Sequence, residues 1–146
     1  LFNPDQLALT GVLAEMIIPA TDTPGALAAG AHQAIGRLLL DCESAANQRR
    51  FVAGLAMLDK VAGAEGGAGF AALPAARRGE LMALMEAGGA PFTNTDKRFF
   101  IQLKALTVFA YCTSEAGATL ALSYLPVPGG YQGNVPLARV GRAWAL

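Results

Sequence analysis

Apolar residues recur at three- and four-residue spacing in five stretches of the chain, which is the period of an amphipathic helix. The first stretch follows Asn3, a candidate N-cap, and Pro4, which suits a first helical position; Gln6 stands where a capping box needs it. The apolar face of this helix comprises Leu9, Val12, Leu13, Met16 and Ile17. Pro19 ends the pattern, and residues 21–25 (TDTPG) predict a turn.

Three shorter patterns predict the next helices. The stripe of the second comprises Leu27, Ala31, Ile35, Leu38 and Leu39. A third helix follows the candidate cap Ser44, and its stripe comprises Phe51, Leu55 and Leu58. The glycines of residues 63–69 then predict a flexible connection. A short fourth helix is expected between Pro74 and Gly88.

The strongest pattern begins at Thr93 or Thr95. It is apolar over a wide arc, so we expect this fifth helix to be central. From residue 125 onward proline and glycine punctuate the chain, which predicts an irregular tail. The predicted fold is therefore all-α: an irregular bundle of about five helices with a long non-helical C-terminal tail. We expect one helical domain over residues 1–146, with the tail (125–146) extended and packed on the bundle or on a partner.

The composition points to a partner. Of the 146 residues, 53% are hydrophobic and only 15% are charged, well below the roughly 25% charged that is typical. Such a chain would leave much apolar surface in water, and large exposed apolar patches mark partner or membrane contacts. Proline and glycine break the longest uncharged stretch (116–138), so no transmembrane segment is predicted. A net charge of zero gives no electrostatic basis for binding nucleic acid.

The sequence contains no recognisable catalytic, cofactor-binding or metal-binding constellation. His32 is the only histidine, and a lone histidine in a helix is usually structural. The glycines lack the pattern of a phosphate-binding loop. Carboxylates are scattered over different predicted elements, so no acid/base pair can be named. We therefore predict no catalytic, cofactor-binding or metal-ligating residue in this chain.

The tail carries residue types that are common in interface hot spots. Tyr131, Arg139, Arg142 and Trp144 are the candidate partner contacts. An equally acceptable interpretation is that the tail folds back on its own bundle, with Trp144 in the core. Two cysteines, Cys42 and Cys112, permit one disulfide in an oxidising compartment, or remain as two buried free thiols.

Blocks along nearly the whole chain resemble the gluconate 2-dehydrogenase subunit 3 family. The blocks are IIPATDTPGA (17–26), FVAGLAMLD (51–59), FFIQLKALTVFAYCTSEAGAT (99–119), YLPVPGGYQGNVPL (124–137) and GRAW (141–144). The resemblance implies a small, chaperone-like subunit that stabilises a large FAD-binding flavoprotein of the GMC type and escorts it, often with a twin-arginine signal, to the periplasm. It also implies a cytochrome c electron acceptor, hence haem c, in a third subunit, and no catalytic residue in the small subunit.

The resemblance also bears on the cysteines. Cys112 stands where the family-like string is expected to hold an aromatic residue, and pairing with Cys42 would compensate for the lost ring. An exported location favours that bridge, so we predict a Cys42–Cys112 disulfide, formed if the helices that end near these residues pack side by side.

The leading hypothesis is thus a non-catalytic subunit of a heteromeric FAD-dependent sugar or glucoside dehydrogenase, located in the periplasm or on the periplasmic face of the inner membrane. Two alternatives stay open: a stand-alone small helical enzyme that uses His32 with a nearby carboxylate, and a generic helical binding module.

Overall fold

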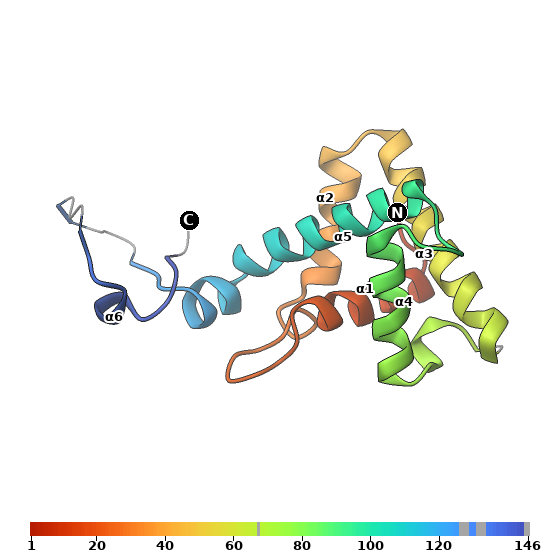
Figure 1. The fold of residues 1–146 in the computed structure, drawn as a ribbon. Helices are drawn as coiled ribbons and strands as arrows, with labels where there is room; N and C mark the ends of the chain where they lie inside the picture. The colour runs from red at the N-terminus through yellow and green to blue at the C-terminus, as the bar shows by residue number, and fades with distance from the viewer. Residues whose placement is uncertain (67, 126–128, 131–133, 145–146) are drawn as a thin grey trace.

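The computed structural model describes residues 1–66, 68–125, 129–130 and 134–144. In these residues the chain forms five long helices and no strand. The long helices are α1 (Pro4–Ile17), α2 (Ala31–Cys42), α3 (Ala45–Gly66), α4 (Ala75–Ala87) and α5 (Asn94–Cys112). Three short helical turns complete them: η1 (Phe70–Ala72), η2 (Gly117–Ala121) and α6 (Leu137–Val140) (Figure 1). The predicted all-α class is confirmed, and α6 adds a four-residue helix to the tail.

The predicted N-caps form as expected. The Asn3 side chain accepts a hydrogen bond from the Gln6 amide at 2.8 Å, and Gln6 Oε1 accepts one from the Asn3 amide at 3.1 Å. Thr93 caps α5 through the same reciprocal arrangement with Asp96. Ser44 Oγ accepts from the Asn47 amide at 3.3 Å at the start of α3. These side chains satisfy amides that would otherwise lack partners in the first turn of each helix.

Two boundaries differ from the prediction. The second helix begins at Ala31 rather than near Leu27, because the preceding residues form a turn that closes at Gly30 with φ +72°. Leu27 therefore lies outside the helix and is exposed. The third helix continues to Gly66, and the chain leaves it through Gly69 at φ +80°, so the expected flexible connection is shorter.

Helix α5 is the axis of the bundle, as its pattern predicts. It contacts each of α1, α2, α3 and α4 (Figure 1). Phe99 is fully buried and packs edge-on against Phe51, with ring centroids 5.0 Å apart. Gly54 makes this contact possible, because a Cβ at residue 54 would lie 2.1 Å from the Phe99 ring. Helix α3 can therefore approach α5 only with glycine at residue 54.

Beyond the bundle, α5 continues into η2 and the tail (Figure 1). The tail returns to η2 and the residues after it rather than to the bundle: the Ser123 amide donates to the Ala143 carbonyl at 2.6 Å, and Ser123 forms a parallel bridge with Trp144. Arg142 donates to the Leu120 carbonyl. The described residues between 117 and 144 thus form an arm that projects from one end of the bundle.

Two glycines of α3 allow a matched test of the α3–α5 contact. We expect Gly54→Ala to lower the free energy of unfolding by about 1–3 kcal/mol, because the added methyl overlaps the Phe99 ring. In Gly63→Ala the new Cβ meets no atom within 4 Å, so the same change should be neutral or stabilising by up to about 1 kcal/mol. Urea unfolding followed by circular dichroism measures both. Equal effects of the two substitutions would contradict the close approach at Gly54.

Candidate partner-binding surface

The far half of α5 presents an apolar face to solvent. Residues 105–114 carry no charge, and one side of the helix is formed by Ile101, Ala105, Val108, Phe109 and Cys112. Phe109 is 55% exposed, and Ile101 and Val108 are exposed to a similar degree. The last part of this side is uncovered because α5 extends past the helices that surround its first half (Figure 1).

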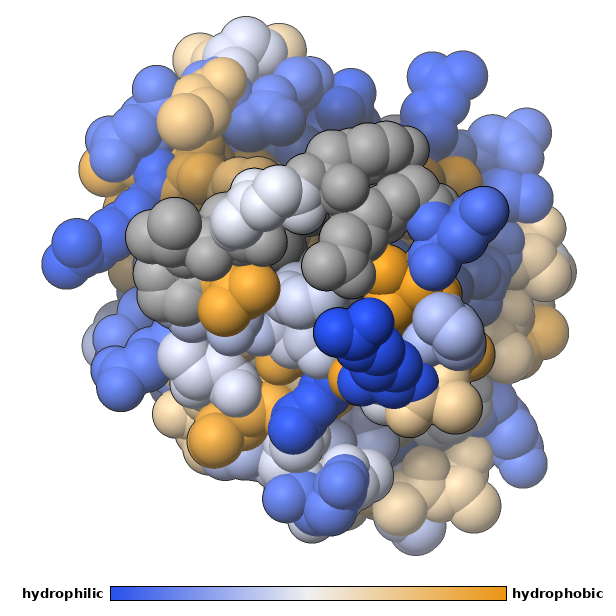
Figure 2. All heavy atoms as spheres, turned by 90° about the vertical axis from the view of Figure 1, so that its left-hand side faces the viewer, coloured by the Kyte–Doolittle hydropathy of each residue, from blue (hydrophilic) through white to orange (hydrophobic). Residues whose placement is uncertain are grey.

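The projecting arm continues the exposed apolar surface. Among its described residues, the exposed large apolar side chains are Leu120, Tyr124, Leu125, Leu137 and Trp144. Figure 2 shows the end of the molecule from which the arm projects, where apolar side chains are interspersed with polar ones. Together, the exposed side of α5 from Val108 onward and the arm form what we call the apolar end.

The structure places the predicted tail contacts on the arm. Trp144 is 52% exposed and pairs with Ser123, so it lies outside the hydrophobic core. Arg142 is exposed and holds the end of η2 through the Leu120 carbonyl. Arg139 lies exposed on α6 and forms no ion pair among the described residues. Tyr131 lies outside the described residues. The alternative in which Trp144 seals the bundle is therefore wrong, whereas partner contact remains a prediction.

A loop formed by residues 18–30 lies beside the apolar end and is fixed by two side chains that sequence reasoning missed. The Glu15 carboxylate accepts hydrogen bonds from the amides of Ala20 and Leu27, both at 2.9 Å. From α5, Tyr111 donates its hydroxyl proton to the Pro24 carbonyl at 2.8 Å. The IIPATDTPGA block therefore forms a loop whose shape α1 and α5 jointly determine.

A signal for Glu15 existed in the sequence. A carboxylate in the last turn of a helix faces the negative end of the helix dipole, which is unfavourable. The position of Glu15 thus indicated that another group compensates for it. For Tyr111, a tyrosine on the buried face of a helix needs a partner for its hydroxyl group, but the sequence did not show which carbonyl it meets.

The turn between α5 and η2 is built by Ser114 and Gly117. Ser114 Oγ donates to the Tyr111 carbonyl at 2.7 Å and accepts from the Gly117 amide at 3.0 Å. A Cβ at Gly117 would lie 1.9 Å from the Tyr111 carbonyl oxygen. Only glycine at residue 117 therefore allows η2 to fold back so closely. The glycine of the TSEAGAT block (113–119) is thus required by the shape of this turn.

A groove of about 400 Å³ separates the loop from η2. Its lining residues are Ala28, Ala29, Ser114, Glu115, Ala116, Thr119 and Leu120. The side chains are mostly small, and Glu115 is the only charged one. This groove joins the fixed loop to the apolar end.

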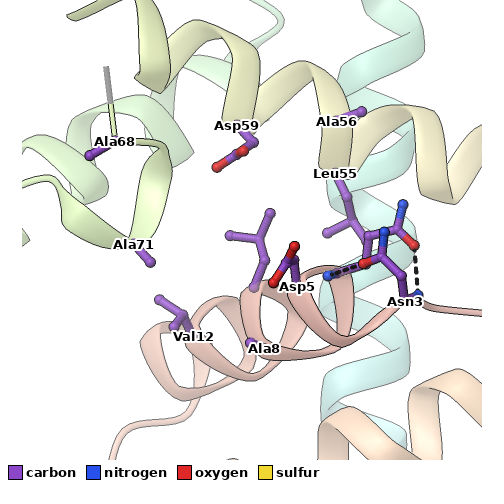
Figure 3. Close-up of a pocket in the computed structure, with 11 residues that line it drawn as sticks. Asn3, Asp5, Ala8, Val12, Leu55, Ala56, Asp59, Ala68 and Ala71 are labelled. Carbon is purple, nitrogen blue, oxygen red and sulfur yellow. Dashed lines mark hydrogen bonds between the residues drawn. The ribbon is translucent and has the colours of Figure 1, made fainter. Parts of the chain in front are cut away.

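A larger pocket of about 530 Å³ lies between α1, α3 and η1 (Figure 3). Asp5 and Asp59 both line it, but each has a role in the bundle itself. Asp59 accepts a hydrogen bond from the Phe70 amide at 2.8 Å and thereby anchors η1. Asp5 lies in the first turn of α1, where the helix dipole favours a carboxylate. Alanines form much of the remaining wall.

His32 is half-buried, and its ring packs near Gly11 of α1. Its Nδ1 atom has no hydrogen-bond partner, and no carboxylate of the described residues lies within ion-pair distance of its ring. Within the described part of the chain, no three His, Cys, Asp or Glu side chains gather closely enough to hold a metal ion. In the same residues, no helix combines the length and apolar character needed to cross a membrane.

The structure contradicts the predicted Cys42–Cys112 disulfide, because both thiols are free. Cys42 ends α2, and the next residue, Glu43, accepts a hydrogen bond from Gln102 in the middle of α5 at 3.1 Å. Ten residues separate Gln102 from Cys112, which is about 15 Å along a helix axis. A disulfide requires Cα atoms within roughly 7 Å. The prediction failed because α2 ends beside the middle of α5, not beside its end.

A family model for gluconate 2-dehydrogenase subunit 3 matches residues 4–129. The chain belongs to the gluconate 2-dehydrogenase subunit 3 family. Membership indicates a subunit of a dehydrogenase complex. No curated protein and no solved structure is significantly similar to the chain.

The gluconate 2-dehydrogenase subunit 3 match covers most of the candidate surface. The loop, its anchors Glu15 and Tyr111, the groove and the exposed side of α5 all lie within residues 4–129. All four predicted tail contacts lie beyond the match: Tyr131, Arg139, Arg142 and Trp144.

The loop should depend on Glu15. Glu15→Ala removes the acceptor of both loop amides, so we expect hydrogen exchange in residues 18–27 to become about tenfold faster or more. Glu86→Ala is the matched control, because Glu86 pairs only with the Lys104 side chain at the surface. Hydrogen–deuterium exchange with mass spectrometry measures both. Unchanged protection of the loop in Glu15→Ala would show that Glu15 is dispensable.

Chemical counting of free thiols should find both cysteines unpaired. In the denatured, unreduced protein we expect two reactive groups, and one in Cys42→Ser. In the native protein, Cys42 should react before Cys112, because Cys42 is exposed and Cys112 is half-buried. If no free thiol is found after denaturation, the two cysteines form a disulfide. Helix α2 would then have to pack on α5 in a different register.

Proposed function

We propose that this chain is a non-catalytic accessory subunit that binds the FAD-containing flavoprotein of a sugar or glycoside dehydrogenase complex. Family membership supports a subunit of such a complex. The proposed binding to the flavoprotein rests on the amount and location of exposed apolar surface. The flavoprotein of the GMC type would hold FAD, and a cytochrome c subunit would receive the electrons.

The chain exposes more surface than a compact protein of its mass. Its accessible area is 8535 Å² at 15.0 kDa. Compact monomers of that mass expose about 7,000 Å², which leaves an excess of about 1,500 Å². Obligate interfaces bury 2,000 Å² or more in total, shared between two partners. The excess is therefore of the size that one partner contributes to an obligate interface.

Most of the exposed large apolar side chains of the described residues lie where the chain leaves its bundle. Of the exposed large apolar side chains, seven belong to the apolar end: Val108, Phe109, Leu120, Tyr124, Leu125, Leu137 and Trp144. An arm that packs on little else of its own chain gains stability when a partner covers it. Arg139 and Arg142 provide charged groups at the rim of this surface, and Tyr131 is a further candidate contact.

In this proposal the oxidation reaction takes place in the flavoprotein and not in this chain. The flavoprotein would oxidise the sugar and determine its identity. This chain would stabilise the flavoprotein by covering its matching apolar surface and would accompany it during export to the periplasm. Such a role needs a complementary surface rather than a catalytic group, and we assign it to the fixed loop and the apolar end.

Substitutions of side chains that have the same exposed fraction test the location of the interface. Phe109 is 55% exposed at the apolar end, and Leu40 is 56% exposed at the end of α2. We expect Phe109→Ser and Trp144→Ser each to weaken binding of the flavoprotein about tenfold or more, and Leu40→Ser to have little effect. The measurement is retention of the flavoprotein of the complex, quantified by flavin absorbance, on the immobilised variants.

The controls separate folding from binding. Circular dichroism should show unchanged helical content in all three variants, because each substituted side chain is exposed. Failure of the unmodified chain to retain any flavoprotein would overturn the proposed function. A loss caused by Leu40→Ser alone would place the interface on the bundle.

A further inference from the structure

Glu115, in the groove between the loop and η2, stands apart from the other glutamates of the chain. Glu65 and Glu80 pair with Arg77, and Glu86 pairs with Lys104. Glu15 accepts two backbone amides, and Glu43 accepts side-chain amides of Asn47 and Gln102. The Glu115 carboxylate alone among the six receives no hydrogen bond and forms no ion pair within the described residues.

The other polar groups of the groove are already engaged. Ser114 Oγ donates to the Tyr111 carbonyl, and Thr119 Oγ1 donates to the Glu115 carbonyl at 2.7 Å. Arg142 of the arm donates to the Leu120 carbonyl and forms no ion pair with Glu115. The groove therefore presents one unneutralised negative charge.

The shape of the groove suits a long side chain with a charged tip. Ala28, Ala29, Ala116 and Leu120 provide apolar walls, and about 400 Å³ exceeds the space that one side chain needs. Lysine and arginine pack their aliphatic stems on apolar surface while the charge meets a polar group. Both walls are held in place, the loop by Glu15 and Tyr111 and η2 by Ser114 and Gly117.

We propose that this groove receives a lysine or arginine side chain of the dehydrogenase partner, whose charged end pairs with Glu115. The proposal rests on the proposed function, because it names the contact by which the flavoprotein would be recognised. The groove adjoins the apolar end, so one partner surface can cover both. Apolar contact would supply most of the affinity, and the ion pair would set the orientation of the two subunits.

Two pairs of variants test the groove. Ala28→Phe fills it, whereas Ala76→Phe adds the same ring to an exposed position on α4. Glu115→Gln removes its charge, whereas Asp41→Asn removes an exposed charge at the end of α2. The probe is the purified flavoprotein of the complex, and its dissociation constant is measured by surface plasmon resonance at low and high salt.

We expect Ala28→Phe to weaken binding about tenfold or more and Glu115→Gln to weaken it about three- to tenfold, with no change for the two controls. The salt dependence of binding should fall in Glu115→Gln but not in Asp41→Asn, because one ion pair is lost. Glu115→Lys should bind more weakly still, through repulsion. Replacing the lysine or arginine of the flavoprotein that pairs with Glu115 by glutamate should restore binding to the Glu115→Lys variant.

The remaining outcomes separate the two proposals. If the unmodified chain does not bind the flavoprotein, the proposed function fails and the groove proposal fails with it. If it binds and all four variants bind equally, only the groove proposal is overturned. Sensitivity to Ala28→Phe without sensitivity to Glu115→Gln would mean an apolar occupant, which contradicts the proposal. A change in self-association of the isolated chain would assign the groove to a second copy instead.

Discussion

The structure depends on the packing of α5 through the centre of the bundle. This helix contacts all four other long helices, and its Phe99 ring packs so close to α3 at Gly54 that a Cβ there would overlap it. A methyl group there would push the two helices apart, and the remaining helices pack around this pair. The core therefore requires a residue without a side chain at the centre of a 22-residue helix, despite the cost of glycine in a helix interior.

The same helix also creates the candidate surface. In its first half the surrounding helices bury Phe99, Phe100 and Leu103, and Ile101 is the exposed exception. Its second half extends past the bundle, so Val108 and Phe109 on its outer side remain exposed, while Tyr111 on the inner side anchors the loop at Pro24. Core and surface are thus two parts of one continuous apolar helix, and the difference between them is the presence of neighbouring helices.

Polar groups determine the shape of that surface more than its apolar residues do. Glu15, Tyr111 and Ser114 each satisfy backbone groups of segments that lack regular structure, namely the loop and the turn into η2. Without these bonds, the unpaired amides and carbonyls would favour other conformations in water. A surface that is rigid before binding loses less entropy when a partner covers it, which suits an accessory subunit that works by complementarity.

The sequence by itself determined the helices, their caps and the excess of apolar surface. Periodicity, Asn3, Ser44 and Thr93 are local signals, and they act within a few residues of where they stand. The tertiary structure alone decided where those helices meet. It placed the end of α2 beside Gln102, which separates Cys42 from Cys112, and it left Trp144 on an exposed arm. It also brought Ala28 and Glu115 to opposite walls of one groove. These outcomes depend on the register and crossing of helices that are far apart in the chain, and no local pattern specifies them.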